Sequence, residues 1–150
     1  MEPLIIFTHI QKTAGTSFLK HVVEANIDSS TILEGSIKSI ARELESQHQF
    51  VTGHIPYGIH VFTQRRTQYI TFLREPIDRA VSHYYFIRQC DPTLCKHDRY
   101  PDAMNYSLAE FYQQPRYQNE MTRMIAGLHW DRASKYIGAT PPQPLDAMAC

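Results

Sequence analysis

A segment near the N-terminus, Gln11–Ser17, carries residues that can hold a phosphate group. It follows an apolar run that predicts a strand and precedes a stretch with helical periodicity. The first backbone N–H groups of a helix have no partner within the helix, and the helix dipole adds partial positive charge there. Gly15 would let the backbone approach a phosphate closely, and Lys12 would add a positive charge. The expected contacts come from Lys12, Thr13, Ala14, Gly15, Thr16 and Ser17.

This segment alone leaves two interpretations open. In one it binds a nucleotide phosphate. In the other it is an ordinary strand-to-helix turn in which Thr16 and Ser17 only cap the helix. The segment is not a Walker A loop, because no Gly-Lys-Ser/Thr follows a first glycine at the required spacing. A standard ATPase or GTPase is therefore disfavoured.

A second segment, Tyr69–Phe86, favours the phosphate interpretation. Arg74 follows a predicted strand, at the edge where open α/β sheets bind ligands, and Ser82 lies in the helix that Pro76 begins. An arginine there can form a forked, charge-assisted contact to phosphate, to which a serine can add a hydrogen bond. The alternative is a surface ion-pair cluster, which would contribute little to stability and would not explain charges beside an apolar strand. That cluster would comprise Arg74, Glu75, Asp78 and Arg79.

The two segments together resemble a known family. HIQKTAGTSF (His9–Phe18) and TFLREPIDRAVSHYYF (Thr71–Phe86) look like the two nucleotide motifs of the sulfotransferases that use PAPS, 3′-phosphoadenosine 5′-phosphosulfate. The branch is that of the heparan sulfate 2-O- and 6-O-sulfotransferases and their bacterial relatives. The first motif resembles the loop that binds the 5′-phosphosulfate, and the second resembles the element that binds the 3′-phosphate. The pair in this order is far more specific than either motif alone.

Two further segments extend the resemblance over residues 4–128. VTGHIPYGIH (Val51–His60) resembles the region of the catalytic base, and NEMTRMIAG (Asn119–Gly127) resembles a stretch that follows the 3′-phosphate helix. The resemblance implies that His54 is the base and that Arg123 contacts donor or acceptor. The alternative for Arg123 is an arginine on the surface of a helix. The resemblance also assigns residues to the two phosphates. Lys12, Gly15, Thr16 and Ser17 would contact the 5′-phosphosulfate, and Arg74 and Ser82 the 3′-phosphate.

The chemistry needs a base and a positive charge. Sulfuryl transfer, like phosphoryl transfer, depends on positioning and on stabilising charge, so Lys12 suits the bridging oxygen of the departing nucleotide. Histidine titrates near neutrality and suits the proton of the acceptor hydroxyl. His54 follows a predicted strand end, His60 is the second candidate, and His9 is expected to be structural. The 2-O-sulfotransferases carry a second histidine where this chain has Thr52, which predicts a different acceptor geometry.

Strands alternating with helices must position these residues, which predicts an α/β fold of three layers with a mainly parallel sheet and a P-loop-like strand-loop-helix. Strands are expected over residues 4–10, 50–55 and 69–73. Helices are expected over residues 18–26, 32–46, 77–88, 107–114 and 119–128, with a loop over 89–106. A capping box, Ser107 with Glu110, marks one helix start.

Composition places the chain among globular proteins of single-domain size: of 150 residues, 43% are hydrophobic and 20% charged. Acidic and basic residues cancel, so no overall field attracts nucleic acid, and a strongly anionic glycosaminoglycan is mildly disfavoured. Neither a signal peptide nor a membrane span is evident, and a cytoplasmic location is expected. Cys90 and Cys95 are expected to be free thiols, with a bridge between them as the alternative.

The leading hypothesis is one PAPS-binding domain over residues 1–150, shortened at its C-terminus, that transfers a sulfuryl group to a carbohydrate hydroxyl. The alternatives are a non-catalytic module that binds PAP or PAPS and, less favoured, a nucleotide kinase. No metal is expected, because no histidine or cysteine group has metal-ligand spacing. The sequence does not indicate the acceptor or the oligomeric state.

Overall fold

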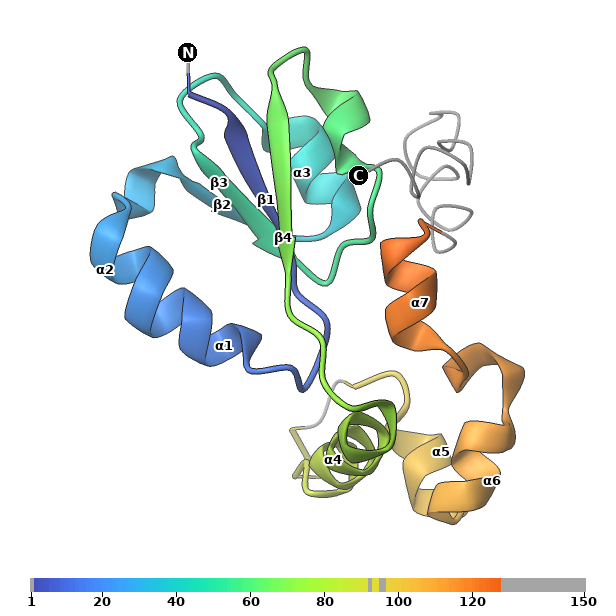
Figure 1. The fold of residues 1–150 in the computed structure, drawn as a ribbon. Coiled ribbons are helices and arrows are strands. Elements are labelled where there is room, and N and C mark those ends of the chain that lie inside the picture. The colour runs from blue at the N-terminus through green and yellow to red at the C-terminus, as the bar shows by residue number, and fades with distance from the viewer. Residues whose placement is uncertain (1, 92, 95–96, 128–150) are drawn as a thin grey trace. The chain divides into compact units, whose positions relative to one another are not determined.

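The structure, a computed structural model, describes residues 2–91, 93–94 and 97–127 (Figure 1). Its internal contacts divide the chain into two units. Of the described residues, the first unit comprises 2–73 with 121–127, and the second comprises 74–91, 93–94 and 97–120. Each unit is described by itself below.

The first unit is built on a four-stranded sheet in the order β2-β3-β1-β4. Every pairing is parallel, and β1 lies between β3 and β4. The carboxyl ends of the strands therefore meet at one edge of the sheet, where ligands bind in open α/β folds. The strands are β1 (Leu4–Thr8), β2 (Ile32–Glu34), β3 (Phe50–Gly53) and β4 (Thr67–Thr71).

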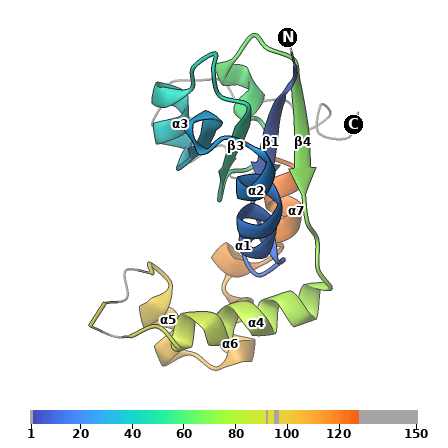
Figure 2. The same ribbon diagram turned by 90° about the vertical axis from the view of Figure 1, so that its left-hand side faces the viewer.

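Helices cover both faces of this sheet, which confirms the expected three-layer α/β class. Alternate residues of β1 point to opposite faces. Leu4 and Ile6 pack in the cluster that includes Ile40 of α3 (Ile37–Glu43), whereas Phe7 packs with Leu19 on the other face. That second face is covered by a helical segment of three parts: α1 (Gly15–Phe18), a π-helical turn (Leu19–Val23) and α2 (Glu24–Asn26). Figures 1 and 2 show α1 and α3 on opposite sides of the sheet.

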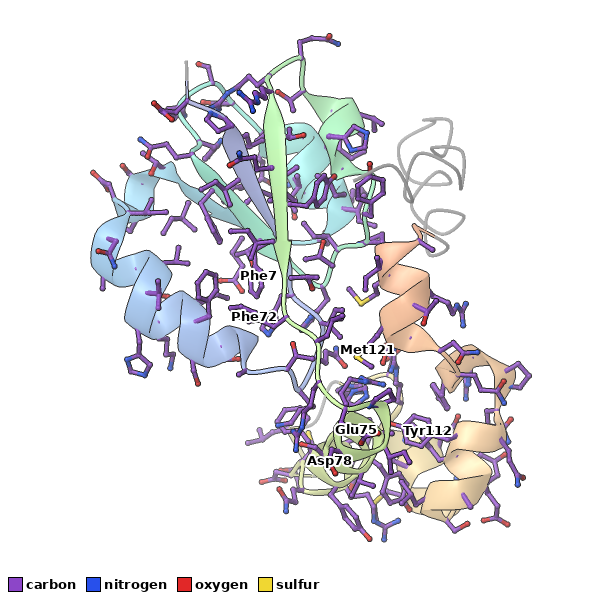
Figure 3. All side chains as sticks on the ribbon, viewed as in Figure 1. Phe7, Phe72, Glu75, Asp78, Tyr112 and Met121 are labelled. Atoms are coloured by element: carbon purple, nitrogen blue, oxygen red, sulfur yellow. The ribbon has the colours of Figure 1, made fainter. Side chains whose placement is uncertain are left out.

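Aromatic rings hold β1 and the segment after β4 together beneath α1. Phe72 lies beside Phe7 (Figure 3), with 5.6 Å between the ring centroids. Phe18 of α1 makes an edge contact with Phe72 at 4.9 Å. Such pairs add about 0.5–1.5 kcal/mol beyond the burial of their area. Helix α1, which ends the first motif, is thus packed against the end of the sheet.

One expected helix, over residues 32–46, is wrong. Residues Ile32–Glu34 form β2 beside β3, and only Ile37–Glu43 is helical. Ser36 caps this helix by accepting a hydrogen bond from the backbone N–H of Ser39. A β-branched residue at Ile32 and a glycine at position 35 favour a strand and a break over a continuous helix.

The second unit is helical and packs around its own core. Its elements are α4 (Pro76–Arg88), α5 (Tyr100–Asn105), α6 (Leu108–Gln113) and a 3-10 turn (Pro115–Tyr117). Tyr84 and Ile87 of α4 pack with Phe111 of α6. The Pro76 helix start and the Ser107–Glu110 capping box are confirmed. Helix α5 was not expected, because residues 89–106 have the composition of a loop.

Three smaller findings complete the fold. Helix α7 (Glu120–Ile125) replaces the expected helix over 119–128, and the backbone N–H of Tyr57 donates to the carbonyl of Met124 at 2.8 Å. Cys90 is disulfide-bonded, so the expected free thiol there is wrong, while Cys95 and Cys150 lie outside the described residues. Within the described part of the chain, no helix combines the length and apolar character needed to cross a membrane.

Candidate active site

The loop between β1 and α1 has an unusual backbone. Lys12 and Ala14 adopt left-handed conformations, with φ of 65° and 70°, which residues with a side chain rarely adopt. Thr13 is buried, and its hydroxyl donates to the carbonyl of Ile10 at 2.8 Å. This internal hydrogen bond holds the tight path of the loop. Thr13 therefore shapes the loop from inside instead of offering its side chain to a ligand.

The N-terminus of α1 carries no side-chain cap. Its N-cap residue is Ala14, and the first helical hydrogen bond runs from Phe18 to Ala14. The N–H groups of Gly15, Thr16 and Ser17 precede that bond, as the first amides of a helix do. The Thr16 and Ser17 side chains are exposed. The interpretation of this segment as a simple side-chain cap is therefore wrong, and its donors fit a phosphate or sulfate group.

Gly15 is required by a neighbour that the sequence did not reveal. A Cβ atom at this position would overlap the imidazole ring of His9. The two residues lie at opposite ends of the same loop, so their contact closes it. Gly15 is buried and has no positive φ, so packing, and not backbone freedom, demands glycine here.

His54 follows the last residue of β3 and has an exposed side chain. Its Nδ1 atom lies 2.6 Å from the carbonyl oxygen of His9. A carbonyl oxygen only accepts hydrogen bonds, so Nδ1 must carry the proton and donate it. The other ring nitrogen, Nε2, then holds a lone pair in the neutral form. This is the tautomer that a general base needs, fixed by a hydrogen bond on the far side of the ring.

His9 lies against His54, with 4.8 Å between the two ring centroids. Burial, together with the neighbouring His54, lowers the pKa of His9 to about 4. His9 is therefore neutral at pH 7. It contacts Gly15 of the loop as well, so one imidazole links the loop and His54.

A pocket of about 320 Å³ opens beside His54 at the carboxyl edge of the sheet. It lies at the ends of β1, β2 and β3, which are neighbours in the sheet. Two glycines let the chain segments approach: a Cβ atom on Gly53, whose φ is +152°, would overlap the carbonyl of Gly35. The lining residues are His9, Glu34, Gly35, Ser36, Gly53 and His54.

The second candidate base, His60, has a different environment. The hydroxyl oxygen of Tyr69 accepts hydrogen bonds from the backbone N–H groups of Gly58 and His60, at 3.2 and 3.0 Å. Its own proton is then available for Nδ1 of His60, 3.0 Å away. Burial raises the pKa of Tyr69 to about 12, so the tyrosine keeps this proton. His60 thus takes part in a hydrogen-bond network that holds the 3-10 turn Ile59–Phe62.

The residues expected at the 3′-phosphate belong to the second unit. Arg74 is exposed between β4 and α4, and Ser82 is half-buried within α4. The alternative surface ion-pair cluster is wrong for Arg79, which is buried and bonded to Glu120 at 3.1 Å. Glu75 instead caps α4, accepting from the N–H of Asp78 at 2.7 Å (Figure 3 labels both).

The remaining residues that the sequence singled out lie outside the pocket lining. Thr52 is buried in β3 and contributes no side chain to the pocket. Arg123 lies in α7, half-buried, and its role stays a prediction. Among the residues that the structure describes, no group of three or more His, Cys, Asp or Glu side chains could hold a metal ion.

The sequence interpretation missed Glu34 and Ser36, which line the pocket. It assigned them to a helix, so their place at the sheet edge was hidden. The available signal was an apolar strand followed at once by a polar residue and glycine. The same pattern, Thr52-Gly53-His54, was recognised as a strand end in β3.

Comparison with known proteins agrees with this architecture. The model of the sulfotransferase family matches residues 2–140. Heparan sulfate 2-O-sulfotransferase 1 from Mus musculus is 30% identical over 104 residues, and the Homo sapiens protein is 29% identical over the same length. Each match covers 57% of this chain and only 29% of the relative. No solved structure matches the chain. Since the family model covers most of its length, the chain belongs to the sulfotransferase family.

Proposed function

We propose that this chain transfers a sulfuryl group from PAPS to a hydroxyl of a carbohydrate, with His54 as the general base. The observation that carries the proposal is the anchored imidazole: Nδ1 is held by the carbonyl of His9 at 2.6 Å, which leaves Nε2 to accept a proton. That base lies on the lining of a pocket and next to the residue that closes the anion-binding loop.

The donor would bind at two places. Lys12 and the N–H groups of Gly15, Thr16 and Ser17 would hold the 5′-phosphosulfate, which suits the uncapped start of α1. Arg74 and Ser82 would hold the 3′-phosphate. A single PAPS-binding domain over residues 1–150 is part of this proposal. PAPS supplies the activated sulfuryl group, and no metal is required.

The transfer itself follows from these positions. The acceptor oxygen forms a bond to sulfur while the bond from sulfur to the bridging oxygen of the 5′-phosphosulfate breaks. The hydroxyl proton passes to Nε2 of His54, and the electron pair of the broken bond passes to the bridging oxygen. Lys12 offsets the negative charge that develops there. A positioned base of this kind contributes about 10²–10⁴ in rate.

The carbohydrate acceptor is supported by the relatives, whose names specify 2-O-sulfation of heparan sulfate. The cytoplasmic location expected from the sequence stays a prediction, and one observation opposes it. Cys90 is disulfide-bonded, and disulfides persist mainly in oxidising compartments.

Two measurements test the proposal. Calorimetry should show tight binding of PAP, the product nucleotide, and no comparable binding of ATP. Incubation of the chain with PAPS carrying labelled sulfate should move the label to a carbohydrate. Tight PAP binding without transfer to any acceptor would favour the non-catalytic module, and ATP binding without PAP binding would favour the kinase.

A further inference from the structure

The pocket beside His54 has a one-sided charge. Of the described residues that line it, none is a lysine or an arginine, and one, Glu34, is acidic. Glu34 is exposed at the end of β2, and β2 pairs with β3, the strand that precedes His54. The base and the carboxylate thus come from neighbouring strand ends and share one pocket. A ligand that presents a hydroxyl to His54 must also accommodate Glu34.

The other lining groups do not offset this charge. His9 is neutral at pH 7, because burial holds its pKa near 4. Ser36 already accepts a hydrogen bond from the N–H of Ser39 as the cap of α3, and the two glycines carry no side chain. Lys38 is exposed on α3 and does not line the pocket. Lys12 is assigned to the donor.

From this lining we infer that the acceptor is a neutral sugar, carrying no carboxylate or sulfate on the ring that enters the pocket. The carboxylate oxygens of Glu34 can accept hydrogen bonds from sugar hydroxyls, whereas an anionic ring would meet a like charge with no lysine or arginine among the described lining residues. The pocket volume of about 320 Å³ lies at the small end of the range for ligand sites, which suits one sugar ring. This inference rests on the proposed function and names its substrate class.

The test compares two acceptors, methyl glucoside and methyl glucuronide, in which a carboxylate replaces the CH2OH group at C6. Initial rates of sulfate transfer from PAPS would be measured with the full chain, and PAP binding would be measured in parallel. We expect kcat/KM to favour the glucoside about tenfold. This lies between the effects expected for fully screened and for unscreened repulsion between the carboxylates of Glu34 and the glucuronide. Glu34→Gln should reduce this preference severalfold, and Glu34→Lys should reverse it. Glu24→Gln, an exposed acidic position on α2, is the matched control and should leave the preference unchanged.

The outcomes separate this inference from the proposed function. Transfer that favours the glucuronide, or a preference that Glu34→Lys leaves unchanged, would overturn the neutral acceptor while the sulfotransferase proposal stands. PAP binding with no transfer to either sugar would also overturn the neutral-sugar assignment. If the unmodified chain did not bind PAP, the proposed function itself would instead be overturned.

Discussion

Two histidines of this chain lie beside other ionisable groups, and burial gives them opposite properties. His54 is exposed, with one nitrogen anchored and the other available. His83 is completely buried in the second unit, 3.7 Å from Glu120, and neither ring nitrogen has a hydrogen-bond partner among the described residues. Burial lowers the pKa of His83 to about 3, so its contact with Glu120 is not an ion pair at neutral pH.

The charge of Glu120 is satisfied by arginines instead. Its carboxylate accepts hydrogen bonds from Arg79 at 3.1 Å and from Arg99 at 2.6 Å. The pKa of Glu120 falls to about 2: burial raises it, but the hydrogen bond and charge of Arg99, with smaller contributions from His83 and Arg79, outweigh that effect. Burial gives different roles even to residues that are neighbours in the sequence. Ser82 is half-buried and proposed to bind a ligand, and His83 next to it belongs to the core.

The largest expected effect is on stability, and it follows from disrupting the buried cluster of Glu120, Arg79 and Arg99. Glu120→Ala would leave Arg79 buried without its partner, and removing one partner of a buried pair costs about 3–5 kcal/mol. Urea unfolding at pH 7 would measure the free energy of unfolding. Glu43→Ala is the control, because Glu43 forms an exposed ion pair with Arg42 and should change stability by less than about 1 kcal/mol. Equal losses in the two variants would contradict the structural role of the cluster.

Arg74 and Arg79 should differ in the same way as the two histidines: the exposed arginine should affect ligand binding, and the buried one should affect stability. Arg74→Ala should weaken PAP binding about 10–100-fold, the worth of a charge-assisted contact, and should leave adenosine 5′-phosphosulfate binding nearly unchanged because that nucleotide lacks the 3′-phosphate. Arg79→Ala should mainly lower the free energy of unfolding. Calorimetry with both nucleotides measures the first effect. If Arg74→Ala weakened both nucleotides equally, its role at the 3′-phosphate would be wrong.

A smaller effect is expected on how the stability of the fold depends on pH. The pKa of His83 is depressed from 6.5 to about 3, so the unfolded chain binds a proton that the folded chain excludes between these values. Stability should therefore fall as the pH drops below about 6.5, by about 2 kcal/mol between pH 7 and pH 5 from this group. His9 acts in the same direction, and Glu120 adds its own loss below its unfolded pKa of 4.5. Urea midpoints should depend less steeply on pH in His83→Gln, and an unchanged slope would contradict a neutral His83.

The sequence predicted the sheet edge better than the pocket. Strands β1 and β3 were found because their apolar runs end in polar residues, and the start of α4 was found from Pro76. The short strand β2 was hidden, because three residues carry no measurable periodicity and the helix after it extends the pattern. Glu34 was missed for that reason. The linking position of His9 could not be predicted, because it depends on contacts across the loop with Gly15 and across two strands with His54.

The most direct test of the account replaces the base while keeping its anchor. In His54→Asn, the side-chain amide can still donate to the carbonyl of His9, but no atom replaces Nε2. His60→Asn is the matched control, because that histidine bonds Tyr69. We predict that sulfate transfer from PAPS falls about 10²–10⁴-fold in His54→Asn with PAP binding retained, and changes little in His60→Asn. Full activity in His54→Asn, or the larger loss in His60→Asn, would contradict the assignment of the base.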